Sequence, residues 1–543
     1  KKIFFNIFMA FTDVIITDFS VEIKFIIMDK KPLSETAVAS LKKKPLVAIF
    51  GAGVSGLKMA HECIKRNMEV HVYEERALPG GKCIGYIASG LPSELTHRQM
   101  FSSNTVLLET LKEIPTKTGN LLEKLEPITN VQFVWTHKDK SMDFSRENFS
   151  ILTELIDNLK SANAMFFDGV PLKDIYWFKT RLTQKIKNSE EKEMPISKYF
   201  EYDKRPELAA FLHKVLSSWI AGSDFSRTGD ILQLLLCKKI KASPLSPPTY
   251  SITFNGPISE CLIMPWYHFL KEKGVKFHFN SKLESVQRGN TKVESVILNN
   301  GEKVIADAYA IATPPAPAIA VFPELKPLIN VENIKSHGFQ LHMKTIPEKF
   351  KKKTLGIIID SAWGLSYKVY HTNKYHHTKF GEGVVATLSI TATRMEYHNG
   401  IVYNKPLIEC NHEEVRDEIL AQMGISNEVF ATCFNGALKI GPGALIVPIE
   451  VAKKQEYDSW FKGPIIPNSS KDDVCWVIQD QLINPSYKNK VHTKSSLSGN
   501  VYLGGEWVNN DKQKWTIPST LERSMENALH CTEEIIKDTI ISK

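Results

Sequence analysis

Three glycines spaced for binding a phosphate carry the clearest chemical meaning in this sequence. Gly51, Gly53 and Gly56 stand in the order G-x-G-x-x-G within the segment LVAIFGAGVSGLKMAHECIKRNMEVHVYE. The first glycine of such a motif permits a tight turn, the second lets the backbone approach a pyrophosphate, and the third lets a helix pack closely on the preceding strand. Glu74 follows 23 positions after Gly51, where a carboxylate can accept hydrogen bonds from ribose hydroxyls. The spacing predicts a dinucleotide site, and the acid disfavours a 2′-phosphate.

Particular secondary-structure elements must position these residues. Residues 46–50, LVAIF, are a continuous apolar run, which is typical of a central strand in a parallel sheet buried on both faces. Residues 55–67 predict a helix, and residues 69–74 predict a second strand that ends at the acid. The N-terminus of that helix, with Ser55 in its first turn, would face a bound anion, because its free N–H groups and its dipole favour negative charge there.

A second glycine pair follows the second strand. The segment EERALPGGK, residues 74–82, resembles the glycine-doublet signature of the flavin-containing amine oxidase and phytoene desaturase superfamily. The resemblance implies FAD rather than NAD, because NAD dehydrogenases do not characteristically carry this doublet. It also implies that the chain continues around the pyrophosphate and ribityl chain through Glu75, Arg76, Gly80, Gly81 and Lys82.

A later segment, residues 274–315, resembles another part of the same superfamily. Its alternating apolar residues and its NNGE turn predict three strands with a hairpin. In the superfamily a strand of this segment passes the adenine, which the resemblance places near Leu283. The chain then returns through a stretch that corresponds to residues 306–314.

The third matching segment, residues 501–538, holds a predicted strand, a loop and a helix. The resemblance implies that an acid after the strand contacts the ribityl region and that the helix N-terminus points at the flavin ring. Arg523 stands where the superfamily usually has glycine, a departure that would narrow or charge the floor of the pocket. The residues assigned to the cofactor in this segment are Gly505, Glu506, Thr520 and Leu521.

The resemblance covers about residues 45–115, 255–320 and 495–538 and is closest to the phytoene desaturase and hydroxysqualene dehydroxylase-like branch. It implies an α/β fold in which a Rossmann-type FAD-binding domain, that of a two-dinucleotide-binding-domain flavoprotein, is interleaved with an α+β substrate-binding domain. The predicted boundaries are 1–44 for an N-terminal extension outside the fold, 45–90, 255–320 and 495–543 for the FAD-binding domain, and 91–254 and 321–494 for the substrate-binding domain.

His97 and Arg98 are the candidates for chemistry on the substrate side of the cofactor. They lie in the segment ELTHRQMF, which follows the glycine doublet. An arginine there would bind an anionic group or steady a reduced flavin. A histidine could transfer protons, because its ordinary pKa lies near neutrality. The alternative is a surface or cofactor-packing role for both residues, and the sequence leaves the two explanations open.

Some other residues suggest chemistry that the sequence supports less well. Trp507 and Trp515 could line an aromatic pocket for a cation or a polyene, and ordinary packing explains them equally well. His371, His376 and His377 lack carboxylates or thiols at ligand spacing, so an exposed hairpin is the better explanation and no metal is predicted. No cysteine lies in the C-terminal flavin loop, so we expect non-covalent FAD.

The composition is that of an ordinary globular chain. Its 543 residues carry a net charge of +8 on scattered lysines, which indicates a solvated surface rather than a nucleic-acid-binding face. The eight cysteines include no CxxC pair, which favours a reducing, intracellular compartment. Acidic residues interrupt the apolar run in residues 1–27, so we expect no transmembrane span. Peripheral membrane contact and a homo-oligomer stay open.

Together these features predict an FAD-dependent oxidoreductase that transfers a hydride from its substrate to flavin N5. The substrate would be a small molecule, either apolar or an amine, oxidised by two electrons at a C–C or C–N bond, and a desaturase-like reaction is slightly favoured. The electron acceptor is not identified. The alternatives are a flavin-dependent isomerase of an unsaturated lipid and a flavoprotein kept as a structural or assembly component without turnover.

Overall fold

The computed structural model describes most of the chain between residues 44 and 541. The chain divides into a short unit, residues 1–45, and a large unit, residues 46–543, and every helix and strand named below belongs to the large unit. Apart from Lys44, the predicted N-terminal extension lies outside the described residues. The residues not described are 1–43, 89–90, 95, 129, 146–166, 168, 185, 187, 221, 237–242, 248, 250, 335, 352–354, 373–382, 397, 441–443, 449–464, 468–473, 479–481, 486–487, 495–498, 511–519 and 542–543.

A five-stranded parallel sheet gathers three distant parts of the chain. Its strand order is β10-β2-β1-β14-β25, and every neighbouring pair is parallel. The outer strands come from residues more than two hundred positions apart, so the sheet forms only when the intervening chain returns to it. The strands are β1 (Leu46–Phe50), β2 (Glu69–Tyr73), β10 (Lys276–His278), β14 (Ala308–Ile311) and β25 (Val501–Leu503).

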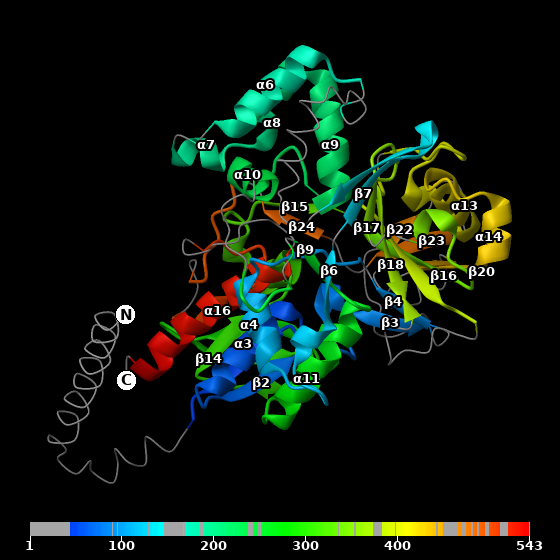
Figure 1. Cartoon of the computed structure of the whole chain (residues 1–543). Coiled ribbons are helices and arrows are strands. Elements are labelled where there is room, and N and C mark those ends of the chain that lie inside the picture. The colour runs from blue at the N-terminus through cyan, green and yellow to red at the C-terminus, as the bar shows by residue number, and fades with distance from the viewer. Residues whose placement is uncertain are drawn as a thin grey trace, which may run out of the picture. The chain divides into compact units, whose positions relative to one another are not determined.

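The central strand β1 is buried on both faces, as its apolar sequence predicts. Val47 and Ile49 point into one apolar core, while Ala48 and Phe50 point into another. The first core is covered by helices, of which α16 runs beside α3 (Figure 1). The second core lies under a three-stranded antiparallel sheet, β11-β12-β13. The bounds are α3 (Val54–Lys65), α4 (Thr105–Glu113), α11 (Met264–Glu272), α16 (Leu521–Ile536), β11 (Leu283–Arg288), β12 (Val293–Leu298) and β13 (Lys303–Val304).

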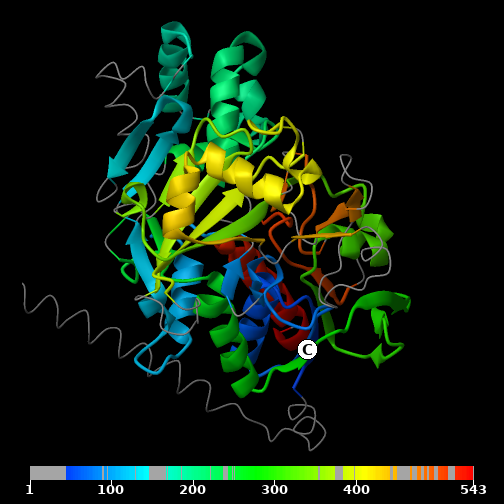
Figure 2. The same cartoon turned by 90° about the vertical axis from the view of Figure 1, so that its right-hand side faces the viewer.

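A seven-stranded mixed sheet, ordered β20-β16-β19-β18-β17-β7-β8, forms the second layer. One face is apolar and packs under α13 and α14, the helices coloured yellow in Figure 2. The other face is buried and polar on β16, β19 and β18, where Gln340, Ser389 and Lys368 share one row. The same face is apolar on β17 and β7. The bounds are β7 (Asn130–Trp135), β8 (Lys140–Ser145), β16 (His337–Met343), β17 (Leu355–Ile358), β18 (Leu365–His371), β19 (Ala386–Ala392), β20 (Phe434–Ile440), α13 (His412–Gln422) and α14 (Asn427–Cys433).

A cluster of helices and several small sheets complete the described fold. The helices pack their apolar side chains with those of β7 and β17 into a separate core. They are α6 (Leu172–Thr183), α8 (Ile196–Tyr199), α9 (Pro206–Ile220) and α10 (Thr228–Leu236). The polar helix α7 (Ser189–Glu193) packs beside α10, and α12 (Pro315–Val321) lies elsewhere, after β14. The remaining strands are β3 (Gly85–Ala88), β4 (Leu91–Glu94), β5 (Met100–Phe101), β6 (Leu125–Ile128), β9 (Ser251–Phe254), β15 (Val331–Ile334), β21 (Ala444–Pro448), β22 (Ile465–Pro467), β23 (Val474–Ile478) and β24 (Leu482–Pro485).

The structure confirms the predicted fold class. The Rossmann-type sheet, the strands expected in residues 274–315 and the interleaved α+β part are all present. The predicted domain boundaries stay a division made on the sequence. One detail bears on them: α4 falls in the range assigned to the substrate-binding domain, yet Leu107, Leu108 and Leu111 pack in the helix-covered core beside the parallel sheet.

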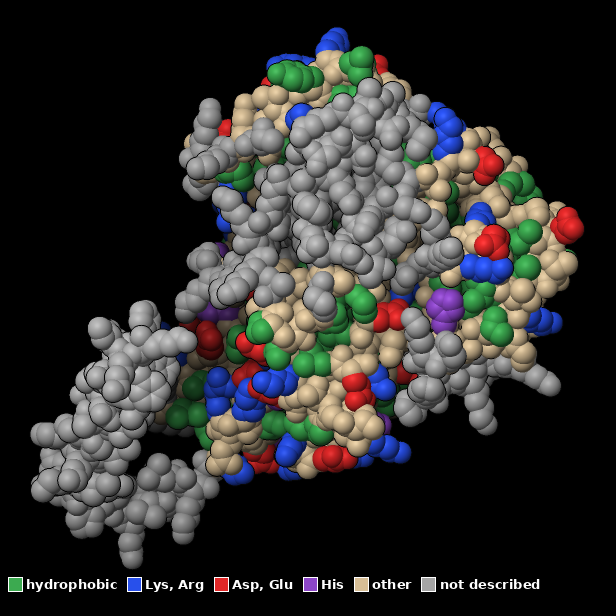
Figure 3. Space-filling view, viewed as in Figure 1, with side chains coloured by type: hydrophobic (Ala, Val, Ile, Leu, Met, Phe, Trp, Pro, Cys, Tyr) green, Lys and Arg blue, Asp and Glu red, His purple; other side chains and the backbone are tan. Residues whose placement is uncertain are grey.

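The surface shows mixed charge. On the face drawn in Figure 3, Lys and Arg side chains are interspersed with Asp and Glu side chains. Within the described part of the chain, every helix is too short or too polar to cross a lipid bilayer.

Gly56 allows α3 to approach the end of β1, and this packing can be tested. A Cβ atom at position 56 would lie far inside the van der Waals distance of the Gly51 carbonyl oxygen, which is rigid backbone. We expect Gly56→Ala to lower the free energy of unfolding by about 2 kcal/mol or more, because the helix must move away from the strand. Gly119→Ala is the control, since its Cβ would meet only Glu123 Oε2 at 3.7 Å. Denaturant midpoints that fall equally in both variants would contradict this account.

Candidate cofactor site

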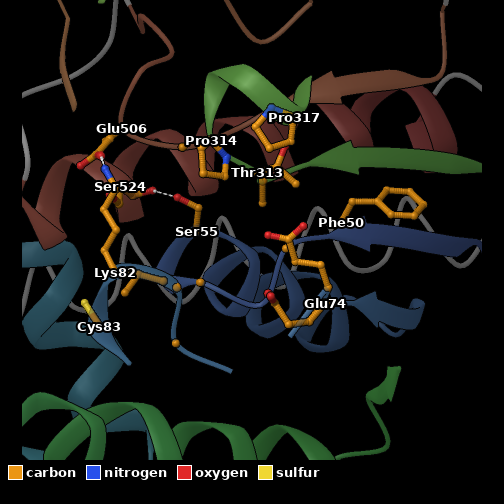
Figure 4. Close-up of a pocket in the computed structure, with 18 of the residues that line it drawn as sticks. Phe50, Ser55, Glu74, Lys82, Cys83, Thr313, Pro314, Pro317, Glu506 and Ser524 are labelled. Atoms are coloured by element: carbon orange, nitrogen blue, oxygen red, sulfur yellow. Dashed lines mark hydrogen bonds and ion pairs between the residues drawn. The ribbon is translucent and has the colours of Figure 1, made fainter. Parts of the chain in front are cut away.

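A cavity opens at the carboxyl ends of the parallel strands, and the space within it, together with its open mouth, is about 1250 Å³. Ligands of open α/β sheets bind at this edge, where neighbouring loops diverge. Loops and helix ends from all three predicted cofactor segments line the cavity (Figure 4). The predicted cofactor residues that line it are Gly51, Gly53, Ser55, Glu74, Glu75, Arg76, Gly80, Gly81, Lys82, Leu283, Gly505, Glu506, Thr520 and Leu521. Gly56 is the predicted residue that does not, because its role is to pack α3 against Gly51.

The two glycine loops form a narrow cradle. Gly80 N–H donates to the Ala52 carbonyl at 2.9 Å, and a Cβ on Gly81 would lie 3.1 Å from the Gly53 Cα. Side chains at these positions would fill the space between the loops. The first turn of α3 contains no acidic residue, and its N-cap makes no side-chain hydrogen bond. Its free N–H groups therefore offer an anion site at the cradle.

Glu74 is fixed at the end of β2 by the backbone around it. One carboxylate oxygen accepts from Ala52 N at 2.7 Å and the other from Arg76 N at 3.1 Å. Burial raises the pKa of this carboxyl, while the Arg76 charge and the two backbone N–H groups act in the opposite direction. Each oxygen keeps a further lone pair for a ligand. The side chain is therefore held ready to accept hydrogen bonds in the cavity.

Two contacts join the N-terminal and C-terminal parts of the site. Lys82 Nζ pairs with the Glu506 carboxylate across the cavity (Figure 4). Ser55 Oγ donates to the Ser524 carbonyl at 3.2 Å, which ties α3 to the first turn of α16. These residues lie more than four hundred positions apart in sequence, so the cavity exists only in the folded chain.

The loop after β25 is supported from behind. Asn527 Nδ2 donates to the carbonyls of Gly505 and Val508, both at 2.8 Å. Arg523 is fully buried, donates through Nε to the Glu506 carbonyl at 2.7 Å and lies 3.8 Å from Asp230. Its side chain does not line the cavity. Our expectation that Arg523 narrows or charges the pocket floor was wrong in this respect, because its guanidinium is directed to the Glu506 backbone and to Asp230 of α10.

Arg98 and His97 take different places, although they are adjacent in sequence. Arg98 lines the cavity, where its guanidinium donates to the Lys82 carbonyl at 2.8 Å and to the Thr96 hydroxyl. His97 does not line the cavity. Its ring nitrogens lie 3.4 Å from Ser366 Oγ and 3.1 Å from Thr391 Oγ1, on the polar face of the seven-stranded sheet.

The surroundings of His97 do not suit proton transfer near neutral pH. Burial, together with the positive charges of Lys368 and Arg98, lowers the pKa of His97 to about 3. The imidazole is therefore neutral at pH 7, and its position gives no support to a proton-transfer role in the cavity. Its hydrogen bonds instead anchor the segment that carries Arg98.

Several lining residues escaped the sequence reasoning. Cys83 lies two positions after the doublet, next to Lys82, and burial raises the pKa of its thiol. Trp507 was considered from the sequence, which left lining and packing open. It is buried and lines the cavity, and its Nε1 donates to the Thr313 carbonyl at 3.0 Å, so it does both. Position next to a known motif could have indicated Cys83. Trp515, His376 and His377 lie outside the described residues, and His371 ends β18.

Two buried polar atoms of lining residues indicate that the cavity receives a ligand. Thr313 Oγ1 and Arg98 Nε have no hydrogen-bond partner within the part of the chain that the structure describes. Buried polar groups are normally hydrogen-bonded, so a ligand that accepts from or donates to these atoms would satisfy them. The glycine cradle, the helix N-terminus and Glu74 offer donors and acceptors that suit a diphosphate joined to a ribose.

The neutral state of His97 gives a test by pH. The unfolded chain takes up a proton as the pH falls below about 6.5, while the folded imidazole stays neutral down to about pH 3, so stability decreases over this window. We expect lowering the pH from 7.5 to 5.0 to cost roughly 1–2 kcal/mol through this residue. His97→Asn should lose correspondingly less stability in urea unfolding at the two pH values. An equal loss in both proteins would show that His97 is already exposed to protonation.

The comparisons with known proteins agree with this geometry. Among solved structures, wild-type putrescine oxidase bound to putrescine shares 12% identity with a TM-score of 0.55, and the alignment covers 91% of this chain and 99% of that one. A CLA-producing fatty acid isomerase from P. acnes shares 12% identity with a TM-score of 0.51, covering 91% and 99%. An oxidoreductase from Methanosarcina mazei shares 10% identity with a TM-score of 0.52, covering 90% and 100%. At these identities the likeness shows the fold alone.

The family comparison is more specific. No curated protein matches the sequence. The family model described as flavin containing amine oxidoreductase matches residues 54–341, which is more than half of the chain. This range contains α3, the acid Glu74 that follows β2, the glycine doublet and the strand that carries Leu283. The chain belongs to the family of flavin-containing amine oxidoreductases.

Proposed function

We propose that this protein binds FAD without a covalent bond and oxidises a small molecule by removing a hydride from a C–C or C–N bond. The observation that carries the proposal is the convergence of three distant segments on one cavity, with all but one of the predicted cofactor residues lining it. Membership in a flavin-containing family supports the cofactor.

The residues present fit FAD. The glycine loops and the N-terminus of α3 would hold the diphosphate, Glu74 the ribose, and Glu506 with Thr520 and Leu521 the ribityl and flavin end. Acceptance of a hydride is the chemistry that FAD supplies when bound. The protein would hold the substrate C–H bond in place, exclude water and stabilise negative charge through the N-terminus of α16.

The absorption spectrum of the purified protein is the first test of this proposal. We expect flavin bands in the visible region, and we expect them to bleach anaerobically with one class of a substrate panel made of amines, polyenes and fatty acids. Precipitation with acid should release the flavin into the supernatant, because attachment is non-covalent. Absence of flavin bands after addition of FAD would overturn the proposal.

Bands that dithionite bleaches but no substrate does would count against an oxidoreductase. A fatty acid that changes structure with no electron acceptor present would instead favour an isomerase. The solved fatty acid isomerase of similar fold is compatible with that alternative, although fold likeness does not identify a substrate.

Glu74 offers a sharper test of the cofactor site. We expect Glu74→Gln to weaken FAD binding about tenfold, because the amide loses one acceptor among the bonds to Ala52, Arg76 and ribose. The measurement is quenching of FAD fluorescence on titration with the FAD-free protein. Glu69→Gln is a matched control on the same strand, since Glu69 is exposed and pairs with Lys276 at 2.8 Å. Equal affinities of the two variants would remove Glu74 from the site.

A further inference from the structure

The charge of Arg98 is not accounted for by the protein around it. Its hydrogen-bond partners are the Thr96 hydroxyl, the Lys82 carbonyl at 2.8 Å and the Cys83 sulfur at 3.7 Å, all of them neutral. Within the described ranges no carboxylate lies within 4.0 Å of this guanidinium, and its Nε is buried without a hydrogen-bond partner. A partly buried cation without a counter-ion carries a large desolvation cost.

Other cations of the cavity differ from Arg98 in this respect. Lys82 is paired with Glu506. Arg76 lies in the field of Glu74 and donates to the Gly81 carbonyl at 3.3 Å. Both side chains come from the segment that carries the glycine doublet, and Lys82 reaches Glu506 in the loop after β25, where the diphosphate and ribityl chain would lie. Arg98 comes instead from the segment that runs from the end of β4 to β5, in which Glu94 and His97 contact the seven-stranded sheet.

The acid that interacts electrostatically with Arg98 is Glu94, and it does not neutralise the arginine. Glu94 is buried on the polar sheet face, where Ser389 Oγ donates to it at 2.8 Å and Tyr370 also bonds to it. Burial raises the pKa of Glu94 against these hydrogen bonds. The carboxyl is thus engaged by the sheet and drawn toward its neutral form.

Arg98 is also held in place before any ligand arrives. Thr253 Oγ1 donates to the Arg98 carbonyl at 2.7 Å, and the neighbouring His97 bonds to two hydroxyls of the sheet. Gln99 on the other side donates to Ser251 Oγ at 3.0 Å. A fixed planar guanidinium with unsatisfied N–H groups matches the two oxygens of a carboxylate.

We propose that Arg98 binds the anionic head group, a carboxylate, of an otherwise apolar substrate. This inference rests on the proposed function and deepens it, since it distinguishes an acid from an amine as the substrate class. An ammonium group would be repelled from the same position. The anion could also come from FAD itself, as its diphosphate or its reduced ring, so the experiment must separate these two sources.

The test titrates the FAD-loaded protein with dodecanoate, methyl dodecanoate and dodecylamine, which share one chain and differ in the head group. Binding is followed by perturbation of the flavin absorption bands. We expect dodecanoate to bind at least about tenfold more tightly than the ester, the size of one charge-assisted hydrogen-bond pair. Arg98→Gln should abolish this preference, Arg98→Lys should keep part of it, and both should retain FAD with unchanged affinity.

Arg416→Gln is the matched control, because the substitution removes the same positive charge from α13. Arg416 is partly exposed and pairs there with Asp417, and α13 packs on the apolar face of the seven-stranded sheet, away from the segment of Arg98. The substitution should leave the preference intact. Failure of dodecanoate to bind, or equal binding of acid and ester, would overturn the inference while the flavin bands still support the proposed function. Loss of FAD in Arg98→Gln would overturn it in favour of a cofactor contact. A wild-type protein that binds no FAD would overturn the proposed function itself.

Discussion

The close approach of α3 to the end of β1 is the constraint on which the cofactor half of the molecule depends. Only a glycine at position 56 lets the helix meet the Gly51 carbonyl, and only then do the first N–H groups of α3 reach the cavity. The same turn exposes Ala52 N–H to Glu74, whose carboxylate joins the end of β2 to the turn. A small displacement of the helix would therefore disturb the proposed anion site and the proposed ribose acceptor together.

The rest of the architecture follows from completing the sheet of β1 and β2 with strands from distant parts of the chain. The parallel sheet needs β10, β14 and β25, and the loop after β25 then lies opposite the glycine doublet. Two long excursions fill the intervals and fold into the seven-stranded sheet and its helices. The first excursion passes the cavity as it leaves the glycine doublet, which explains why Glu94 contacts the seven-stranded sheet while Arg98 lines the cavity. The proposed substrate-side residue, Arg98, therefore lies in a connection between the two layers and not in a strand or helix of either layer.

The sequence allowed prediction of the cofactor half because its signals are local. Glycine spacing, apolar runs and an acid at a strand end depend on backbone geometry within a few residues, so the glycines and Glu74 could be identified directly. Arg523 and His97 could not be placed in the same way. The direction of each side chain depends on partners such as Asp230 and Thr391, which come from elements far away in sequence. Family resemblance supplied the general region and not the orientation.

Charge placement is the remaining link between this fold and its chemistry. In the cradle and its opposing loop, opposite charges lie together: Arg76 with Glu74, and Lys82 with Glu506. A cofactor that binds here can form hydrogen bonds with these side chains at little electrostatic cost, because each charged side chain keeps an opposite charge nearby. Toward the sheet this arrangement ends, since Arg98 meets neutral oxygens and Glu94 is engaged by hydroxyls. A ligand reaching that end would therefore gain most if it brought the missing negative charge itself, which ties substrate choice to one side chain fixed between the two layers.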